Sequence, residues 1–260
     1  MNRSIQFWGL FSREVRRYFK VPLQTLGAPI VSSTLYLLIF GVSLGRAIHI
    51  QEDVSYLAFL IPGLIAMSII KNAFDNSTSA IVGPKYTNEM QDLRTTPFSL
   101  NQISFAKTLA SLSRGILVGI ITYIVGQFFF YFKLGGFMQI TDWTALFFFI
   151  IFGGMAFGQL GIAIGMWASS FEYIGAVSML ILLPLIYLGG VFFDLQNVHP
   201  FWQHVSHLNP LFYIINGIRY GVLGQADINL GPAAGVTLVF FVVTYVLSIL
   251  SLRKGSHYLR

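Results

Sequence analysis

Residues that could do chemistry are few in this chain, and three histidines are the first candidates. His199, His204 and His207 lie in the stretch HPFWQHVSHLNP, and imidazole nitrogens are common zinc ligands. No carboxylate lies at the spacing of a zinc protease motif, and the chain contains no cysteine. We therefore expect no metal in this chain, and we assign the three histidines to hydrogen bonds at a membrane interface.

Covalent catalysis and nucleotide hydrolysis have little support either. Ser170 and Glu172 are neighbours, but no histidine is positioned to act as their base. The phosphate-binding pattern GxxxxGK[ST] is absent, and the sequence Gly83-Pro84-Lys85 does not fit it. We expect no catalytic residue and no cofactor in this chain, so any ATP and magnesium would be bound by a separate subunit.

The composition excludes most protein classes. Apolar residues make up 55% of the 260 residues and charged residues 10%, against roughly 25% charged in an average soluble domain. The mean hydropathy is +0.70. These values exclude disordered, collagen-like and disulfide-stabilised chains, and they indicate a polytopic membrane protein. The net charge of +6 is therefore read as a topology signal and not as a nucleic-acid surface.

Charge-free apolar runs predict six transmembrane helices in one transmembrane domain over residues 1–260, an all-α polytopic fold. The expected spans are 23–45, 54–77, 108–132, 143–169, 173–193 and 230–252. Residues 195–225 contain few charged residues, but Pro200 and Pro210 interrupt any continuous helix there. We therefore expect re-entrant helices shielded by protein. Asp75, Glu172, Asp194 and Asp227 are expected near span ends, which disfavours coupling to protons or sodium.

Basic residues predict the orientation. With the N-terminus inside, eleven lysines and arginines flank the cytoplasmic span ends, and three lie outside. Both termini are therefore expected in the cytoplasm. The outside residues are Arg46, Lys133 and Arg219.

Two cytoplasmic segments have patterns of their own. Residues 4–20 predict an amphipathic interfacial helix with an apolar stripe that includes Trp8 and Phe11, suited to anchoring the chain or to contacting a partner. Residues 84–97 contain Glu89 and Asp92 beside an apolar Met90 and Leu93, a pattern for a short helix that docks into a partner's groove. A solvated turn is the alternative for this second segment.

Four glycines recur at helical spacing in the fourth expected span. They share one helix face, where a second helix can approach closely, so we assign them to helix packing and not to a pore. They are Gly154, Gly158, Gly161 and Gly165.

Three segments together resemble the permease subunit of type-2 ABC transporters of the bacterial exporter type, and the resemblance covers nearly the whole chain. They are REVRRYFKVP at 13–22, NEMQDLRTTPFSLNQISFAK at 88–107, and the block from 184 to 224 that begins PLIYLGGVFFDL. The chain departs from close relatives in one place, where EMQDL replaces a glycine-threonine-leucine-glutamate run.

The resemblance implies a partner, an assembly and a location. It implies two copies of an ABC ATPase subunit that bind ATP and magnesium, a homodimer of this chain, and a bacterial inner membrane. It implies export of an amphipathic, lipid-linked or polysaccharide substrate. The implied ATPase-coupling residues are Arg13, Glu14, Arg16, Arg17, Glu89, Asp92, Leu93 and Arg94. The implied external gate consists of Gly189, Gly190, Asn209, Pro210, Tyr213 and Arg219.

Two alternatives stay open at this stage. An ATP-independent secondary carrier would show inverted repeats, which the two halves do not obviously contain. An intramembrane lipid-modifying enzyme would need a paired nucleophile and base at membrane depth.

Overall fold

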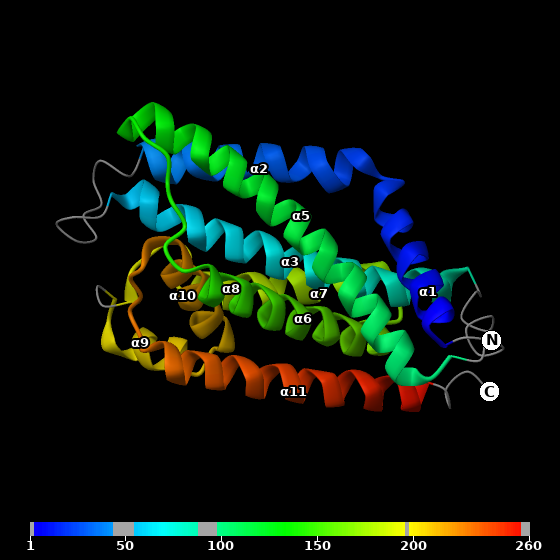
Figure 1. Ribbon diagram of the computed structural model, residues 1–260. Helices are drawn as coiled ribbons and strands as arrows, with labels where there is room; N and C mark the ends of the chain where they lie inside the picture. The colour runs from blue at the N-terminus through cyan, green and yellow to red at the C-terminus, as the bar shows by residue number, and fades with distance from the viewer. Residues whose placement is uncertain (1–2, 44–54, 88–97, 196–197, 256–260) are drawn as a thin grey trace.

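The computed structural model describes residues 3–43, 55–87, 98–195 and 198–255. Within these ranges the protein is built from helices and contains no strand, so the all-α prediction is confirmed (Figure 1). Both termini lie at the same end of an elongated bundle, called the terminal end below, and α9 lies at the other end, the far end.

Six helices of the described chain are long and apolar enough to cross a membrane, as predicted. Span 1 (Leu23–Ser43) consists of α2 (Ala28–Tyr36) between two π-helical segments, and span 5 (Phe171–Leu188) consists of α7 (Phe171–Val177), a π-helical segment and α8 (Leu183–Leu188). The others are α3 (Tyr56–Tyr86), α5 (Leu100–Leu134), α6 (Trp143–Trp167) and α11 (Leu230–Gly255).

Two helices are longer at the terminal end than the hydropathy pattern predicts. Helix α3 continues to Tyr86, past the expected end at residue 77, and α5 begins at Leu100 instead of residue 108. The serine before α5 explains its early start, because Ser99 forms a capping box with Gln102. Hydropathy stops at charged residues, whereas these helices continue because the charged side chains have partners inside the protein.

Helix α3 is the centre of the bundle and packs against α5 and α6. Small residues allow the close approach. A Cβ on Gly161 of α6 would lie 2.6 Å from the carbonyl oxygen of Phe74, and a Cβ on Gly165 would lie 3.0 Å from the carbonyl oxygen of Thr78 and from the Cβ of Ile81. Gly154 and Gly158 of the same helix face α3 and α5. The four glycines therefore lie where three helices meet.

At the far end, the chain folds back between spans 5 and 6. The short helices α9 (Pro200–His207) and α10 (Pro210–Leu223) are joined near Asn209, whose side chain caps α10. Helix α10 is largely buried against α6 and α3. Neither helix has the length needed to cross a membrane, so the pair has the form of re-entrant helices.

The amphipathic N-terminal helix α1 (Arg3–Phe19) packs across the terminal end against α5. It buries Leu10 and Tyr18 there, with Phe7 packed beside Leu10. The predicted apolar stripe is divided: Tyr18 is buried against the protein, Phe11 is partly exposed, and Trp8 is 58% exposed. Helix α1 therefore has one face for the protein and an adjacent aromatic face for the bilayer.

Candidate functional site

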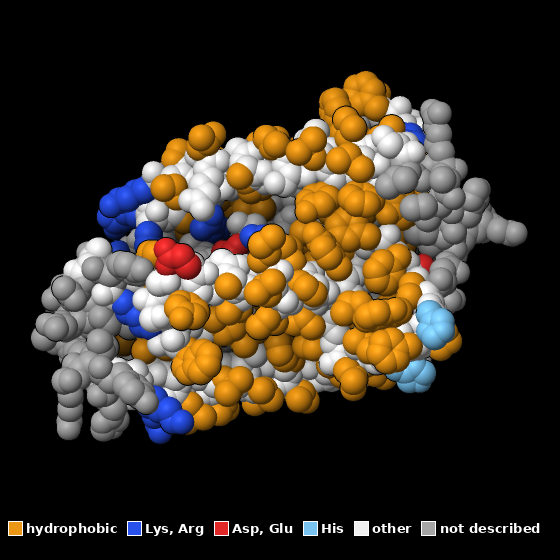
Figure 2. Space-filling model, turned by 180° about the vertical axis from the view of Figure 1, so that it is seen from behind, with side chains coloured by type: hydrophobic (Ala, Val, Ile, Leu, Met, Phe, Trp, Pro, Cys, Tyr) orange, Lys and Arg blue, Asp and Glu red, His pale blue; other side chains and the backbone are white. Residues whose placement is uncertain are grey.

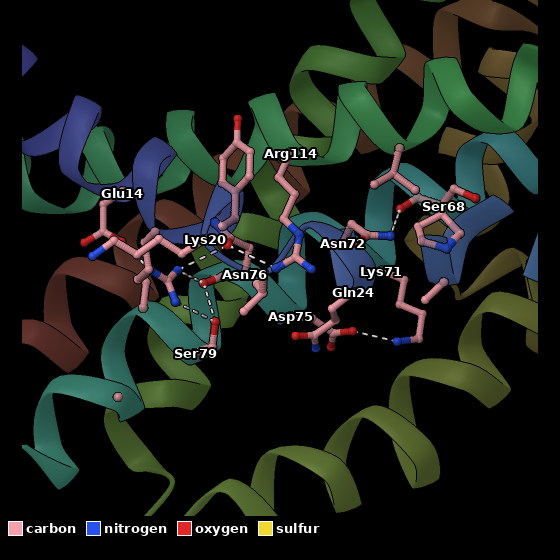
Figure 3. A pocket seen from close by; sticks show the side chains of 18 of the residues that line it. Glu14, Lys20, Gln24, Ser68, Lys71, Asn72, Asp75, Asn76, Ser79 and Arg114 are labelled. Carbon is pink, nitrogen blue, oxygen red and sulfur yellow. Dashed lines mark hydrogen bonds and ion pairs between the residues drawn. The ribbon is translucent and has the colours of Figure 1, made fainter. Parts of the chain in front are cut away.

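A cavity of about 1240 Å³ lies between α1, span 1, α3, α5 and span 5 (Figure 3). Its volume exceeds the roughly 300–1,000 Å³ of ordinary small-molecule pockets. On the molecular face shown in Figure 2, basic and acidic side chains gather toward the terminal end, and hydrophobic side chains cover much of the remainder. The cavity is therefore bounded by helices that come from distant parts of the chain.

One face of α3 supplies the polar wall of the cavity. Its polar residues follow the three-to-four residue spacing of one helix face, and Leu64 and Met67 continue the same wall as an apolar surface toward the far end. The polar residues are Ser68, Lys71, Asn72, Asp75, Asn76 and Ser79. Sequence reasoning missed this wall, although the periodicity in KNAFDNSTS was the signal that could have revealed it.

Asp75 is the acidic side chain of this wall. Its carboxylate accepts hydrogen bonds from Lys71 at 2.6 Å and from the hydroxyl of Ser178 in span 5 at 2.9 Å. Helix α3 extends eleven residues beyond Asp75 to Tyr86, so Asp75 lies within a continuous helix and not at its end. A carboxylate does face the interior, paired with a lysine of its own helix.

Helix α1 closes the terminal end of the cavity through a buried ion pair. The carboxylate of Glu14 accepts from Lys107 of α5 at 2.6 Å and from Arg17 at 2.9 Å. Arg17 also donates to the carbonyl oxygen of Asn76 at 2.8 Å and to Ser79 at 3.0 Å. Burial alone raises the pKa of Glu14, but the charges of Lys107 and Arg17 together outweigh it and hold that pKa below its usual value.

The structure divides the predicted coupling residues of α1. Arg13 and Arg16 are exposed, whereas Glu14 and Arg17 turn inward and tie α1 to α5 and α3. Glu14 is 3% exposed, so it anchors the helix and presents no free carboxylate to a partner. The remaining four predicted coupling residues, Glu89, Asp92, Leu93 and Arg94, lie outside the described residues.

Arg114 of α5 points into the cavity from the opposite wall (Figure 3). It is 9% exposed, and one terminal nitrogen donates to the amide oxygen of Asn76 at 3.3 Å. Its Nε–H has no acceptor among the described residues.

The six predicted gate residues lie together at the far end. Arg219 is buried, donates to the carbonyl oxygen of Gly190 at 2.6 Å, and lies 3.5 Å from the carboxylate of Asp227. Gly190 has a positive φ of 82°, and Gly189 precedes it in close contact with Ile215. This network joins the end of span 5 to α10.

Asn209 and Tyr213 add two further connections in the same region. The amide of Asn209, just before Pro210, donates to the carbonyl oxygen of Leu185 at 2.6 Å, and the Tyr213 hydroxyl donates to the carbonyl oxygen of His207. The ring of His204 contacts the carbonyl oxygen of Pro200 at 2.7 Å. The described residues contain no group of three metal-ligating side chains placed to share an ion.

Comparisons with known proteins agree over most of the chain. The family described as ABC-2 type transporter matches residues 5–223. The inner membrane transport permease YadH of Escherichia coli strain K12 is 35% identical over 246 residues, which cover 95% of this chain and 94% of that protein. Nodulation protein J of Rhizobium meliloti strain 1021 is 25% identical, with 94% of this chain and 92% of that protein covered.

Proposed function

Because this chain belongs to the ABC-2 type transporter family, and so is a transport permease, we propose that it is the membrane subunit of an ATP-driven exporter. Its place as a multi-pass inner membrane protein follows from the six spans and from its similarity to an inner membrane permease. The cavity is then part of the pathway for an amphipathic, lipid-linked or polysaccharide substrate.

The observation that carries this proposal is the two-sided character of the cavity. Polar residues of α3 lie toward the terminal end, and Leu64, Met67, Val118 and Leu183 lie beyond them. Such a cavity suits a molecule with a polar head and an apolar body.

The energy source in this proposal is a separate ABC ATPase, which holds ATP and magnesium. ABC-2 permeases in general work with such a partner. The segment 88–97 joins the ends of α3 and α5, and both helices line the cavity. A push on that segment, with Glu89, Asp92, Leu93 and Arg94 as contacts, would therefore reach the cavity through two helices at once.

Helix α1 is the second coupling element. Its exposed Arg13 and Arg16 are available to the ATPase, whereas Glu14 and Arg17 transmit movement to α5 and α3. The buried ion pair makes α1 move with the cavity walls.

The assembly in this proposal contains two copies of the chain and two ATPase subunits, with both termini in the cytoplasm. Spans 1 and 5 flank the cavity and are the least enclosed parts of its wall, so a second copy would pack there. The far-end network around Arg219 then forms the external gate, which opens when spans 1, 2 and 5 tilt.

Co-purification with the cognate ABC ATPase tests the coupling. The two chains are expected to form a complex with ATPase activity, and the double variant Asp92→Ala/Leu93→Ala is expected to lose it. Arg253→Ala, an exposed change at the end of α11, is the matched control. If the double variant assembled and transported as well as the unmodified chain, segment 88–97 would not be a contact for the ATPase. If the chain alone transported substrate without ATP, a secondary carrier would be favoured.

Because the chain has no cysteine, single cysteines test the orientation directly. An impermeant maleimide added outside intact spheroplasts is expected to label Gly136→Cys at the far end and to leave Arg253→Cys unlabelled. Gly136 has open space around its Cα, so the substitution is tolerated. The reverse labelling pattern would contradict the proposed orientation.

A further inference from the structure

We infer that the cavity binds an amphiphile with an anionic headgroup, of the phosphate or sulfate ester type, and that Arg114 holds that headgroup. This inference rests on the proposed function, because it names the substrate class of the same cavity. It depends on four features of the described residues: the charge of the lining, the state of Arg114, its depth in the membrane, and the apolar surface beyond it.

The lining carries more positive than negative charge. Six basic and two acidic side chains face the cavity, and each acid is already paired, Glu14 with Lys107 at 2.6 Å and Asp75 with Lys71 at 2.6 Å. Glu14 also pairs with Arg17 at 2.9 Å and with Arg13 at 3.6 Å, so Arg16, Lys20 and Arg114 are the basic lining residues that form no ion pair with a lining carboxylate. The basic residues are Arg13, Arg16, Arg17, Lys20, Lys71 and Arg114.

Arg114 is the most buried of these six. A guanidinium has five N–H donors, and the described residues offer Arg114 one acceptor, the Asn76 amide oxygen at 3.3 Å. Among these residues, no carboxylate forms an ion pair with Arg114, and Nε is left without an acceptor. A buried cation without a counterion is strongly destabilising, so the presence of Arg114 here indicates that an anion completes the site.

Neighbouring groups hold Arg114 in place and add donors. The Asn76 amide donates to the hydroxyl of Ser111 at 2.9 Å, which fixes the amide oxygen that Arg114 contacts. Figure 3 shows Lys20, Gln24, Lys71 and Asn72 around the same space. A planar guanidinium with its edge free matches the paired oxygens of a phosphate or sulfate group.

The depth of Arg114 suits a lipid-like headgroup. Arg114 precedes the end of α5 at Leu134 by 20 residues, which is about 30 Å of helix and equals the thickness of a hydrocarbon layer. Arg114 therefore lies at the level of one headgroup layer. Beyond it, the apolar wall formed by Met67 and Leu64 begins about 13 Å from Asn76 along α3 and can receive an acyl or alkyl chain.

The alternative role for Arg114 is a purely structural bond between α5 and Asn76. That role predicts lower stability on substitution and no effect of charge on ligand affinity. Binding measurements with charge-altering variants therefore separate the two roles.

The experiment measures binding of ³²P-labelled hexadecyl phosphate to the purified full-length chain in a neutral maltoside detergent, by scintillation proximity. Saturable binding is expected, with displacement by unlabelled hexadecyl phosphate and weak displacement by hexadecylphosphocholine, whose headgroup carries no net charge. Arg114→Gln is expected to weaken binding about tenfold or more, and Arg114→Lys to retain most of it. Arg253→Gln, an exposed change remote from the cavity, is the control and should bind as the unmodified chain does.

The variant Asp75→Asn distinguishes a direct effect on binding from a loss of folding. It removes the half-buried acid of the cavity and frees Lys71, so hexadecyl phosphate should bind more tightly, by about threefold. Misfolding lowers affinity and cannot produce this gain. Each variant is first checked for a single symmetric peak in size-exclusion chromatography.

Three results would overturn the inference: equal affinity of Arg114→Gln and the unmodified chain, weaker binding by Asp75→Asn, or displacement of the probe by inorganic phosphate as effective as by hexadecyl phosphate. The last result would indicate a site for free anions and not for amphiphiles.

If the chain assembles with its ATPase but binds the probe independently of Arg114, the proposed function stands and this inference fails. A chain that binds the probe as described but never assembles with an ATPase loses the proposed function instead.

Discussion

The carboxylate of Glu14 on α1 lies 2.6 Å from the ammonium group of Lys107 on α5, and both side chains are buried. The two residues are 93 positions apart in the chain. They connect the amphipathic N-terminal helix to a membrane span, and Lys107 also donates to the carbonyl oxygen of Ala80 on α3 at 2.9 Å. One lysine therefore joins α1, α3 and α5 at the terminal end of the cavity.

Removing one member of this pair should be more harmful than removing both. Lys107→Met leaves the Glu14 carboxylate buried without its closest cation, which is expected to cost about 3–5 kcal/mol of stability. The double variant Glu14→Leu/Lys107→Met should recover most of that loss because no buried charge is left unpaired. Thermal unfolding followed by size-exclusion chromatography measures both, with the exposed Lys254→Met as control. Additive losses in the double variant would show that the two charges do not interact.

The same carboxylate predicts a pH dependence. The pKa of Glu14 in the folded protein lies below its usual value of 4.5, so ionised Glu14 contributes stability that is fully present above about pH 4.5. That contribution is lost as the pH falls from there through the lower pKa of the folded state. The melting temperature measured between pH 7 and pH 3 should therefore fall more steeply for the unmodified chain than for Glu14→Gln. Parallel curves would contradict the assignment.

Gly161 should tolerate no larger residue. In Gly161→Ala, the new Cβ would come within 2.6 Å of the Phe74 carbonyl oxygen and force α6 away from α3, at an expected cost of about 1–3 kcal/mol. Gly175→Ala is the control, since that position has open space and alanine favours the helix. Equal melting temperatures for the two variants would show that α6 and α3 do not pack this closely.

Lys85 should hold the turn between α6 and span 5. Its ammonium donates to the carbonyl oxygens of Gly165, Met166 and Ala168 at 2.6–2.9 Å, where α6 ends. Lys85→Met leaves these carbonyls without their charged donor, with an expected cost of about 1–3 kcal/mol. Hydrogen–deuterium exchange should quicken in peptides that cover residues 164–172. Unchanged exchange there, with Lys254→Met as reference, would mean that Lys85 does not restrain this turn.

Arg219 should hold the far-end network. It bonds Gly190, pairs with Asp227 and lies over the ring of Phe59 at 3.8 Å from the centroid. Arg219→Met leaves Asp227 without its cation, and we expect a loss of about 3–5 kcal/mol. Arg219→Met/Asp227→Asn should be less affected, because the unpaired charge is gone. If the double variant were as unstable as Arg219→Met, the unpaired charge of Asp227 would not be the cause, and the loss would come from the missing bond to Gly190.

The sequence by itself determined the number of spans, the all-α class, the re-entrant region and the asymmetry of basic charge. These properties depend on the length of apolar runs, on prolines and on charges at span ends, all of which are local. The expected spans are shorter than the helices, because the second was ended at residue 77 and the third was begun after Lys107, although both helices continue farther toward the terminal end. The glycine spacing in α6 could likewise be read from one helix alone.

Only the tertiary structure decided which charges are inside. Hydropathy averages over all faces of a helix, whereas the cavity depends on a single face of α3 and on partners from α1, α5 and span 5. Arg17, expected to contact the ATPase, turns inward because Glu14, Asn76 and Ser79 lie within hydrogen-bond distance. The energy of a charge in a membrane protein depends on its neighbours in space, and those neighbours are set by how the helices pack.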